Sequence, residues 1–195
     1  RVLLQRSLAP PNDRTANMNP LDMADLVKDT KTLFNNQSEI SKQFKEGYMG
    51  RAAGFDWVEN TMWPSHTRGA SDANYLTNDA TAQTGATLVV DTGATAPSAG
   101  DVCTIAGVYS VHPETKTSTG ILQQFVIGAG ATTTSFPISP AIVASGATQN
   151  VSNAAANNGA VLFLGTASTA VQTSMMYHKN AFAFATADLV MPKGV

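Results

Sequence analysis

The chain has 195 residues, of which 43% are hydrophobic, so it can bury one good core or two small ones. Charged residues make up only 13%, about half the usual share of roughly 25%, which favours a surface covered by neighbours in an assembly. The net charge of −2 offers no basic face for nucleic acid or an anionic membrane, and no apolar run is long enough to span a bilayer. The single cysteine, Cys103, cannot form an internal disulfide and is expected to be a buried, inert thiol.

The charges are distributed unevenly along the chain. Residues 1–68 carry 17 of the 26 charged side chains, and the remainder is dominated by alanine, glycine, serine and threonine. This change in composition predicts an architectural boundary near residues 64–69. Because the chain opens on Arg1 rather than methionine, we expect it to be a piece of a longer protein.

The residue pattern in the first third of the chain predicts helices followed by a strand. Asn19 and Pro20 have the residue types of a helix N-cap and first turn, and the following segment carries an apolar stripe that includes Met23. A second short helix is expected over 38–46. Over 52–60 the pattern changes to period two, which predicts a strand with Phe55 and Trp57 on one side.

From about residue 69 to 146 the pattern is that of short β-strands separated by Gly, Pro, Ser and Thr, so we predict one compact antiparallel barrel or sandwich. Two neighbouring strands should join it to the rest, with Gly69 and Gly146 close together. Pro137 and Pro140 favour an edge position for their strand. The end of the chain reads as two strands around 178–180. The side chains expected in the β core are Val89, Cys103, Ile105, Val108, Phe125 and Ile127.

A triplet, Asp91-Thr92-Gly93, follows a β run and has the letters of an aspartic-protease loop. Such an enzyme needs two facing carboxylates that share one proton, so a homodimer would have to supply the second Asp91. Residues 161–165 ("VLFLG") could serve as the apolar segment behind the loop. The same three residues are also good turn chemistry, because Asp caps its own turn and Gly adopts positive φ.

The sequence contains no clear pattern for another kind of catalytic or binding site. His66, His112 and His178 lie in three separate segments without metal-binding spacing, and each is more simply a surface or core histidine. The Gly-rich stretch 128–135 lacks the Lys and the strand-to-helix setting of a phosphate loop. The sequence therefore predicts no catalytic, cofactor-binding or metal-binding residues, no cofactor, and no enzyme activity.

Four stretches carry a resemblance to a known family when they are taken together and in order. The stretches are "LAPPNDRTANMNP", "LFNNQSEISKQFKEGYMGRAAGFDW", "GDVCTIAGVYSVHPETKTSTGILQQFVI" and "YHKNAFAFATADLVMPKG". With them the chain resembles the major capsid (coat) protein of tailed double-stranded-DNA bacteriophages, in the branch whose coat has a β domain inserted into its axial domain. The likeness touches nearly the whole chain, and the last two stretches are the most telling because they are long.

The resemblance implies an α+β architecture, namely the axial-domain part of the Hong-Kong-ninety-seven-like capsid fold with an inserted antiparallel β barrel or sandwich. Residues 1–65 would begin the axial domain, 66–150 would form the inserted β domain, and 151–195 would return to the axial sheet. The family's N-terminal arm, extended loop and long spine helix would precede Arg1, and further strands would follow Val195.

The resemblance also implies a function. The protein would be a structural subunit that assembles with copies of itself into pentamers and hexamers of an icosahedral shell. Scaffolding and portal proteins would be its other partners, it would enclose DNA without sequence-specific binding, and it would contact no membrane. It would reside in the virion after assembly in the bacterial cytoplasm. On this reading Asp91-Thr92-Gly93 is a turn, and the alternatives are a phage tail or adhesin β module and the dimeric protease.

Overall fold

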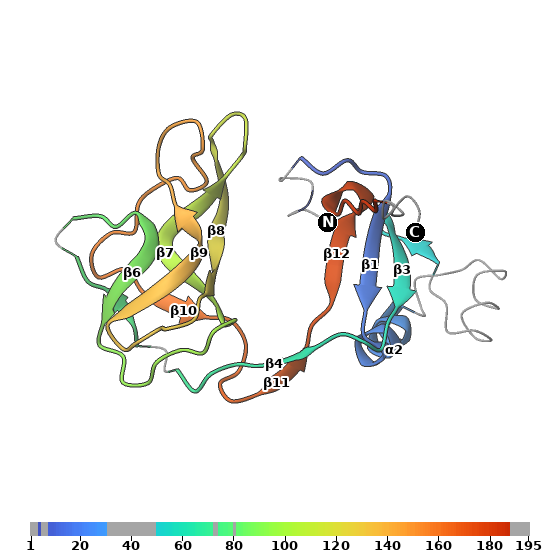
Figure 1. Cartoon of the computed structure of the whole chain (residues 1–195), viewed down its shortest axis with the longest axis horizontal. Coiled ribbons are helices and arrows are strands. Elements are labelled where there is room, and N and C mark those ends of the chain that lie inside the picture. Colours follow the sequence, from blue (N-terminus) through green and yellow to red (C-terminus); the bar gives the residue numbers. More distant parts are fainter. Residues whose placement is uncertain (1–3, 5–7, 31–49, 72–73, 80, 188–195) are drawn as a thin grey trace, which may run out of the picture. The chain divides into compact units, whose positions relative to one another are not determined.

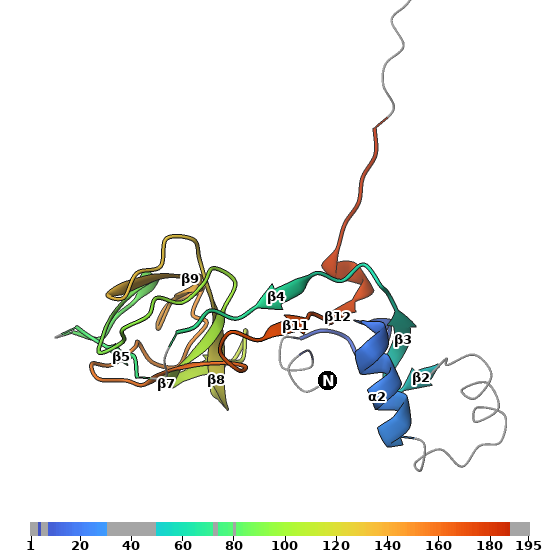
Figure 2. The same cartoon turned by 90° about the horizontal axis from the view of Figure 1, so that it is seen from below.

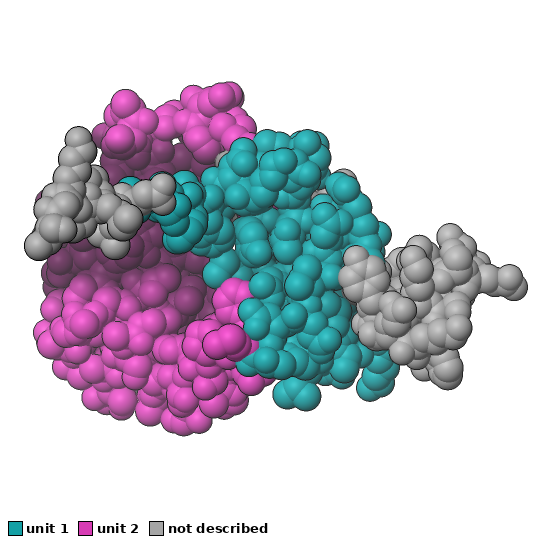
Figure 3. Space-filling model, turned by 45° about the vertical axis from the view of Figure 1, so that its right-hand side comes forward, with its two compact units in different colours: residues 1, 9–61, 174–195 teal, residues 2–8, 62–173 magenta. Residues whose placement is uncertain are grey.

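Two chain segments that are far apart in the sequence build one small sheet, and the residues between them build another. The computed structural model describes residues 4, 8–30, 50–71, 74–79 and 81–187. Unit 1 comprises residues 1, 9–61 and 174–195, and unit 2 comprises residues 2–8 and 62–173 (Figure 3). Each unit is described by itself below.

Unit 1 contains a four-stranded sheet in the order β12-β1-β3-β2. Its strands are β1 (Arg14–Met18), β2 (Arg51–Ala52), β3 (Phe55–Glu59) and β12 (Met175–His178), and a short 3-10 turn, η1 (Lys179–Ala181), follows the last. β1 pairs in parallel with β3 and antiparallel with β12, so it lies between the strand before unit 2 and the strand after it. Phe55 and Trp57 are buried while Val58 is exposed, which confirms the predicted period-two strand.

The one α-helix in the described part of the chain is α2 (Pro20–Thr30), which runs alongside this sheet (Figure 2). Its predicted start is confirmed, because the Asp22 amide donates to Asn19 Oδ1 at 2.9 Å and the Asn19 Nδ2 donates back to Asp22 Oδ2 at 2.6 Å. The first bond satisfies a backbone amide that a helix start leaves without a partner, and the second holds the Asn19 side chain in place. Met23 is buried, as its place on the apolar stripe predicts. The second helix, expected over 38–46, lies outside the described residues.

Unit 2 contains a six-stranded antiparallel sheet in the order β10-β7-β8-β9-β6-β5 (Figure 1). Its two edges meet through main-chain bonds, from Thr77 N to Gly159 O at 3.0 Å and from Val161 N to Tyr75 O at 2.9 Å. The sheet is therefore a nearly closed barrel, as an antiparallel β domain was expected to be. Its strands are β5 (Leu76–Thr77), β6 (Gly85–Asp91), β7 (Val102–Val111), β8 (Ser118–Ile127), β9 (Ser135–Ile142) and β10 (Val161–Phe163).

The barrel interior forms the core of unit 2, and five of the six residues expected there are buried. The sixth prediction, Val89, is wrong: its side chain is 41% exposed, while Leu88 and Val90 point inward. Three consecutive apolar residues cannot all face one side of a strand, because side chains alternate. The Val89 backbone instead bonds the Gln83 side chain on both its amide (2.7 Å) and its carbonyl (2.8 Å).

Two further expectations need correction. The β unit extends to residue 173 rather than 150, since Val151, Ala155 and Val161 complete the barrel core, so residues 151–173 do not return to the host sheet.

β9 is an interior strand between β8 and β6 and not an edge. Pro140 is accommodated because it lies within the register shift opposite Gly85 and Thr87, where the ladder is interrupted.

The expectation of two strands around His178 is half met. β12 ends at His178, whose ring accepts a bond from Asn180 N at 3.2 Å, but residues 182–187 form no strand. Taken together, the described residues are mostly β with one helix and include the predicted β barrel, while the capsid-type axial fold stays a prediction. None of their helices has the length and apolarity needed to cross a membrane.

The buried thiol of Cys103 gives a first testable prediction. Burial raises its pKa from 9.0 to about 12, and the negative charge of Asp101 adds to the effect. We expect iodoacetamide to modify Cys103 only when the protein unfolds, so that the alkylation rate follows the unfolded fraction across a urea titration. Alkylation at the same rate in the folded and the unfolded protein would contradict this.

The same shift predicts a pH dependence of stability. Because the folded pKa is raised, the contribution is fully present below pH 9.0 and is lost as the pH rises toward about 12. The slope over that window is about 1.4 kcal/mol per pH unit at most. The difference in the free energy of unfolding between the wild type and Cys103→Ala should shrink accordingly, and a constant difference would count against the assignment.

Candidate functional site

The chain enters and leaves unit 2 through two adjacent strands. β4 (Ser65–Thr67) and β11 (Ala170–Gln172) pair antiparallel, with His66 opposite Val171. Further main-chain bonds extend the ribbon at both ends, from Arg68 N to Thr169 O at 3.2 Å and from Thr173 N to Pro64 O at 3.2 Å. The prediction of two neighbouring connecting strands is confirmed, although the outgoing strand is β11 and not a segment near Gly146.

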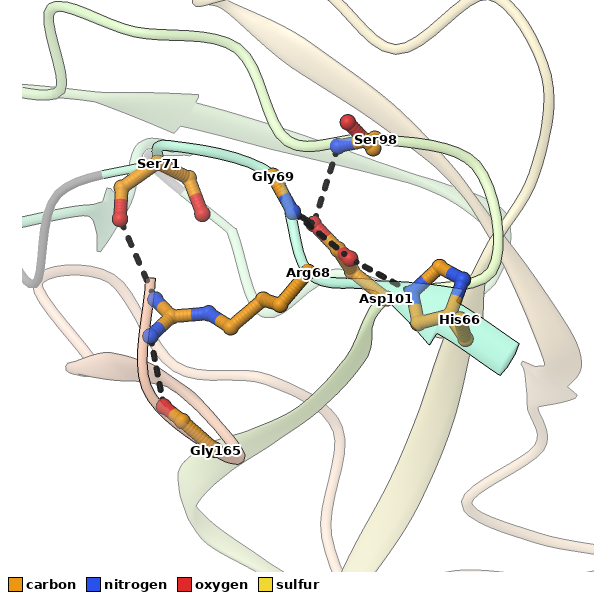
Figure 4. Close-up of polar contacts among 7 residues, drawn as sticks. All are labelled: His66, Arg68, Gly69, Ser71, Ser98, Asp101 and Gly165. Carbon is orange, nitrogen blue, oxygen red and sulfur yellow. Dashed lines mark hydrogen bonds and ion pairs between the residues drawn. The ribbon is translucent and has the colours of Figure 1, made fainter. Parts of the chain in front are cut away.

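A buried carboxylate fastens the incoming strand to the barrel. The Asp101 side chain, directly before β7, is completely buried, and its Oδ1 lies 2.9 Å from His66 Nε2 (Figure 4). Gly69 N donates to both of its oxygens at 3.1 Å, and Ser98 N donates to Oδ2 at 2.9 Å. A buried carboxylate is costly unless such donors surround it. Asp101 therefore holds residues 66–69 and the turn at Ser98 in one arrangement, which we call the connector clamp.

Arg68 anchors the outgoing segment to the same place. Its NH1 donates to Gly165 O at 2.6 Å and its NH2 to Ser71 O at 3.1 Å, and its guanidinium lies 5.5 Å from the centre of the Phe163 ring. One side chain thus contacts the residues just after β4 and just after β10 (Figure 4). Planar geometry and several donors suit arginine to this bridging role.

In the described part of the chain, the His66 and Asp101 side chains of the connector clamp bind each other, and no nucleophilic side chain is paired with His66. His66 has a 36% exposed side chain and uses Nε2 on Asp101, and the structure assigns no hydroxyl to its other ring nitrogen. A hydrolytic triad would need a serine on that nitrogen, with the carboxylate orienting the ring. The geometry is that of a structural fastening.

The other two histidines, His112 and His178, make their hydrogen bonds elsewhere in the chain. His112 Nδ1 accepts from Glu114 N and Thr115 N, both at 3.3 Å, in the turn between β7 and β8. His178 belongs to unit 1. Among the described ranges, no group of three His, Cys, Asp or Glu side chains has the geometry to hold a metal ion.

The Asp91-Thr92-Gly93 triplet forms the end of β6 and the turn after it. Thr92 has a φ of 64°, and its hydroxyl donates to the carbonyls of Asn74 and Asp91. Gly93 lies against the Tyr75 ring so closely that a Cβ there would come within 2.0 Å of its Cζ. One Asp91 oxygen, Oδ1, is buried without a hydrogen-bond partner in the described residues. The triplet does form a bend after the strand, but the expected reason for the glycine is wrong: Thr92 and not Gly93 has the positive φ, and Gly93 is required for the close approach to Tyr75.

The connector clamp was not found by sequence reasoning. His66 and Asp101 are 35 residues apart, and neither belongs to a spacing motif. Asp101 precedes a predicted strand within "SAGDV", which marks a turn but says nothing of its partner. Only the pairing of β4 with β11 brings the distant segments together.

Comparison with solved structures shows a likeness to a known protein domain. No family model matches the chain, and no curated protein matches it. Among solved structures, the chain is similar to the CUS-3 coat protein I-domain, with 28% sequence identity over 54% of this chain and 98% of that one, at a TM-score of 0.34. A TM-score this low does not establish a shared fold.

Proposed function

We propose that this chain is part of a structural subunit of an icosahedral bacteriophage capsid, with unit 2 as a β domain inserted into a shell-forming body. The observation that carries the proposal is the course of the chain. β3 and β12 both flank β1 in one sheet, and the 112 residues 62–173 between them close into their own barrel. An inserted domain must leave the sheet of its host continuous, and this arrangement does so.

The sequence supports the capsid class over other proteins with inserted domains. The four stretches that resemble phage coat proteins fall in both units, before, within and after the barrel. The low charge content also suits chains that tile against one another, where binding energy is spread over many modest interfaces. On this proposal unit 1 belongs to the axial domain of a Hong-Kong-ninety-seven-like fold.

The proposed partners follow from the same resemblance. They are copies of the same protein in pentamers and hexamers, together with scaffolding and portal proteins, and the shell encloses DNA without sequence-specific contacts. A net charge of −2 is compatible with a shell that encloses DNA without binding it strongly. The subunit would reside in the virion after assembly in the bacterial cytoplasm, and it would perform no catalysis.

The test is assembly of the parent protein. We expect its expression, with the scaffolding protein where needed, to give closed shells of uniform diameter in negative-stain electron microscopy. Deleting residues 62–173 and joining Thr61 to Ser174 with a short Gly-Ser linker tests whether the barrel is separable from the host sheet. Unassembled monomer under all conditions for the intact protein would count against the capsid proposal.

A further inference from the structure

An open groove of about 300 Å³ lies beside the connector ribbon in unit 2. Its apolar lining comes from the start of β7, the segment after β10, and β11. Leu164 is 42% exposed and Val171 is 57% exposed, with Val102 beside them. The volume is at the lower end of the range of about 300–1,000 Å³ for ligand pockets, so it suits one or two side chains.

The groove also presents one fixed positive charge. Arg68 lines it, and its guanidinium is held by Gly165 O and Ser71 O and by the Phe163 ring, so its position is preset. No carboxylate in the described part of the chain forms an ion pair with Arg68. Asp101 also lines the groove, but its carboxylate is fully buried and bound by His66, Gly69 and Ser98, while Figure 4 shows the guanidinium pointing away from it.

Hydroxyl and amide groups surround this cation and the apolar wall. Thr166, Thr169 and Gln124 lie along the groove and can bond the peptide groups of an extended chain. Residues 62–173 contain two Lys or Arg and five Asp or Glu, so the unit as a whole repels a polyanion. A single carboxylate beside an apolar side chain therefore complements the groove better than a nucleic-acid backbone does.

We propose that this groove is a docking site for an extended segment of a partner protein in which an apolar side chain is followed by a carboxylate. The apolar side chain covers Val102, Leu164 and Val171, and the carboxylate pairs with Arg68. A preset guanidinium favours such pairing because little side-chain freedom is lost on binding. The proposal stands on the chemistry of the groove and is independent of the capsid assignment.

The test is an NMR titration of the full chain with two capped dipeptides. Acetyl-Leu-Glu-amide should shift the amide signals of Arg68, Val102, Leu164 and Val171 saturably. Acetyl-Leu-Gln-amide, which differs only in charge, should bind about fivefold more weakly, as expected for an ion pair worth about 1 kcal/mol. Equal binding of the two dipeptides, or shifts confined to other residues, would overturn the proposal.

Three variants distinguish a loss of the proposed contacts from a loss of the folded structure. Val171→Glu places a carboxylate on the exposed β11 and leaves Arg68 and its bonds in place, so the preference for the charged dipeptide should disappear while the protein stays folded. Arg68→Lys keeps the positive charge, and it should retain part of the preference that Arg68→Gln loses. Retention of the full preference in Val171→Glu, or shifts at these residues on concentrating the chain alone with none from the dipeptides, would contradict the proposal. The second result would assign the groove to a second copy of the chain.

Discussion

Replacing Asp101 with alanine is expected to destabilise unit 2 by about 2–3 kcal/mol, because the substitution removes the acceptor of several hydrogen bonds. The carboxylate is fully buried, and its removal leaves the amides of Gly69 and Ser98 without their acceptor. A fully buried amide left unpaired costs about 1–3 kcal/mol, and these two amides are only partly buried, so water can replace part of the loss. The measurement is urea unfolding of the full chain, followed by the fluorescence or circular dichroism signal.

Two further variants separate the connector clamp from a general effect of charge. Asp101→Asn keeps the size of the side chain but turns one acceptor into a donor, so it should retain less than half of the stability that the carboxylate confers. Glu114→Gln removes an equal charge from the exposed β7–β8 turn and should change stability by less than about 0.5 kcal/mol. If all three variants unfold at the same urea concentration, Asp101 does not fasten the connector.

Replacing Gly93 with alanine is expected to cost about 3 kcal/mol, the upper part of the range for overpacking a core. The new Cβ would lie 2.0–2.3 Å from three atoms of the Tyr75 ring. That ring has no room to retreat, because it is fully buried, packs edge-on against Phe136 at 4.9 Å between ring centres, and donates its hydroxyl to Thr95 O at 2.9 Å. Thermal unfolding of the variant should show a correspondingly lower midpoint.

A double-mutant cycle gives the matched control for this substitution. In a Tyr75→Leu background the ring is gone, so Gly93→Ala should cost less than about 1 kcal/mol, and the two substitutions should be strongly non-additive. An equal cost in both backgrounds would show that the approach to Tyr75 is not the reason for a glycine at position 93. That result would also weaken the assignment of Asp91-Thr92-Gly93 as a packed turn.

Local patterns predicted several elements correctly because the physics that determines them is local. The cap at Asn19 and the alternation in β3 depend on neighbours within a few residues, and both were predicted. The β character of 102–111 and 118–127 followed from their β-branched and apolar composition.

Other features depend on partners that are distant in the sequence. Which of Leu88, Val89 and Val90 faces inward is decided by the barrel and the Gln83 side chain, and not by the residue types. Residues 151–173 were expected to return to the host sheet, yet Val151 and Val161 fill the core of unit 2. The connector clamp joins His66 to Asp101 across 35 residues, and neither residue type predicts the other as its partner.

The central claim is that unit 2 is an inserted domain of a shell-forming subunit, and cryo-electron microscopy of particles assembled from the parent protein tests it most directly. The account predicts a closed icosahedral shell in which each subunit carries a six-stranded barrel, joined to the shell body by β4 and β11 side by side. Filaments or tail-like assemblies, or a shell in which residues 62–173 are continuous with the sheet of the shell body, would contradict it.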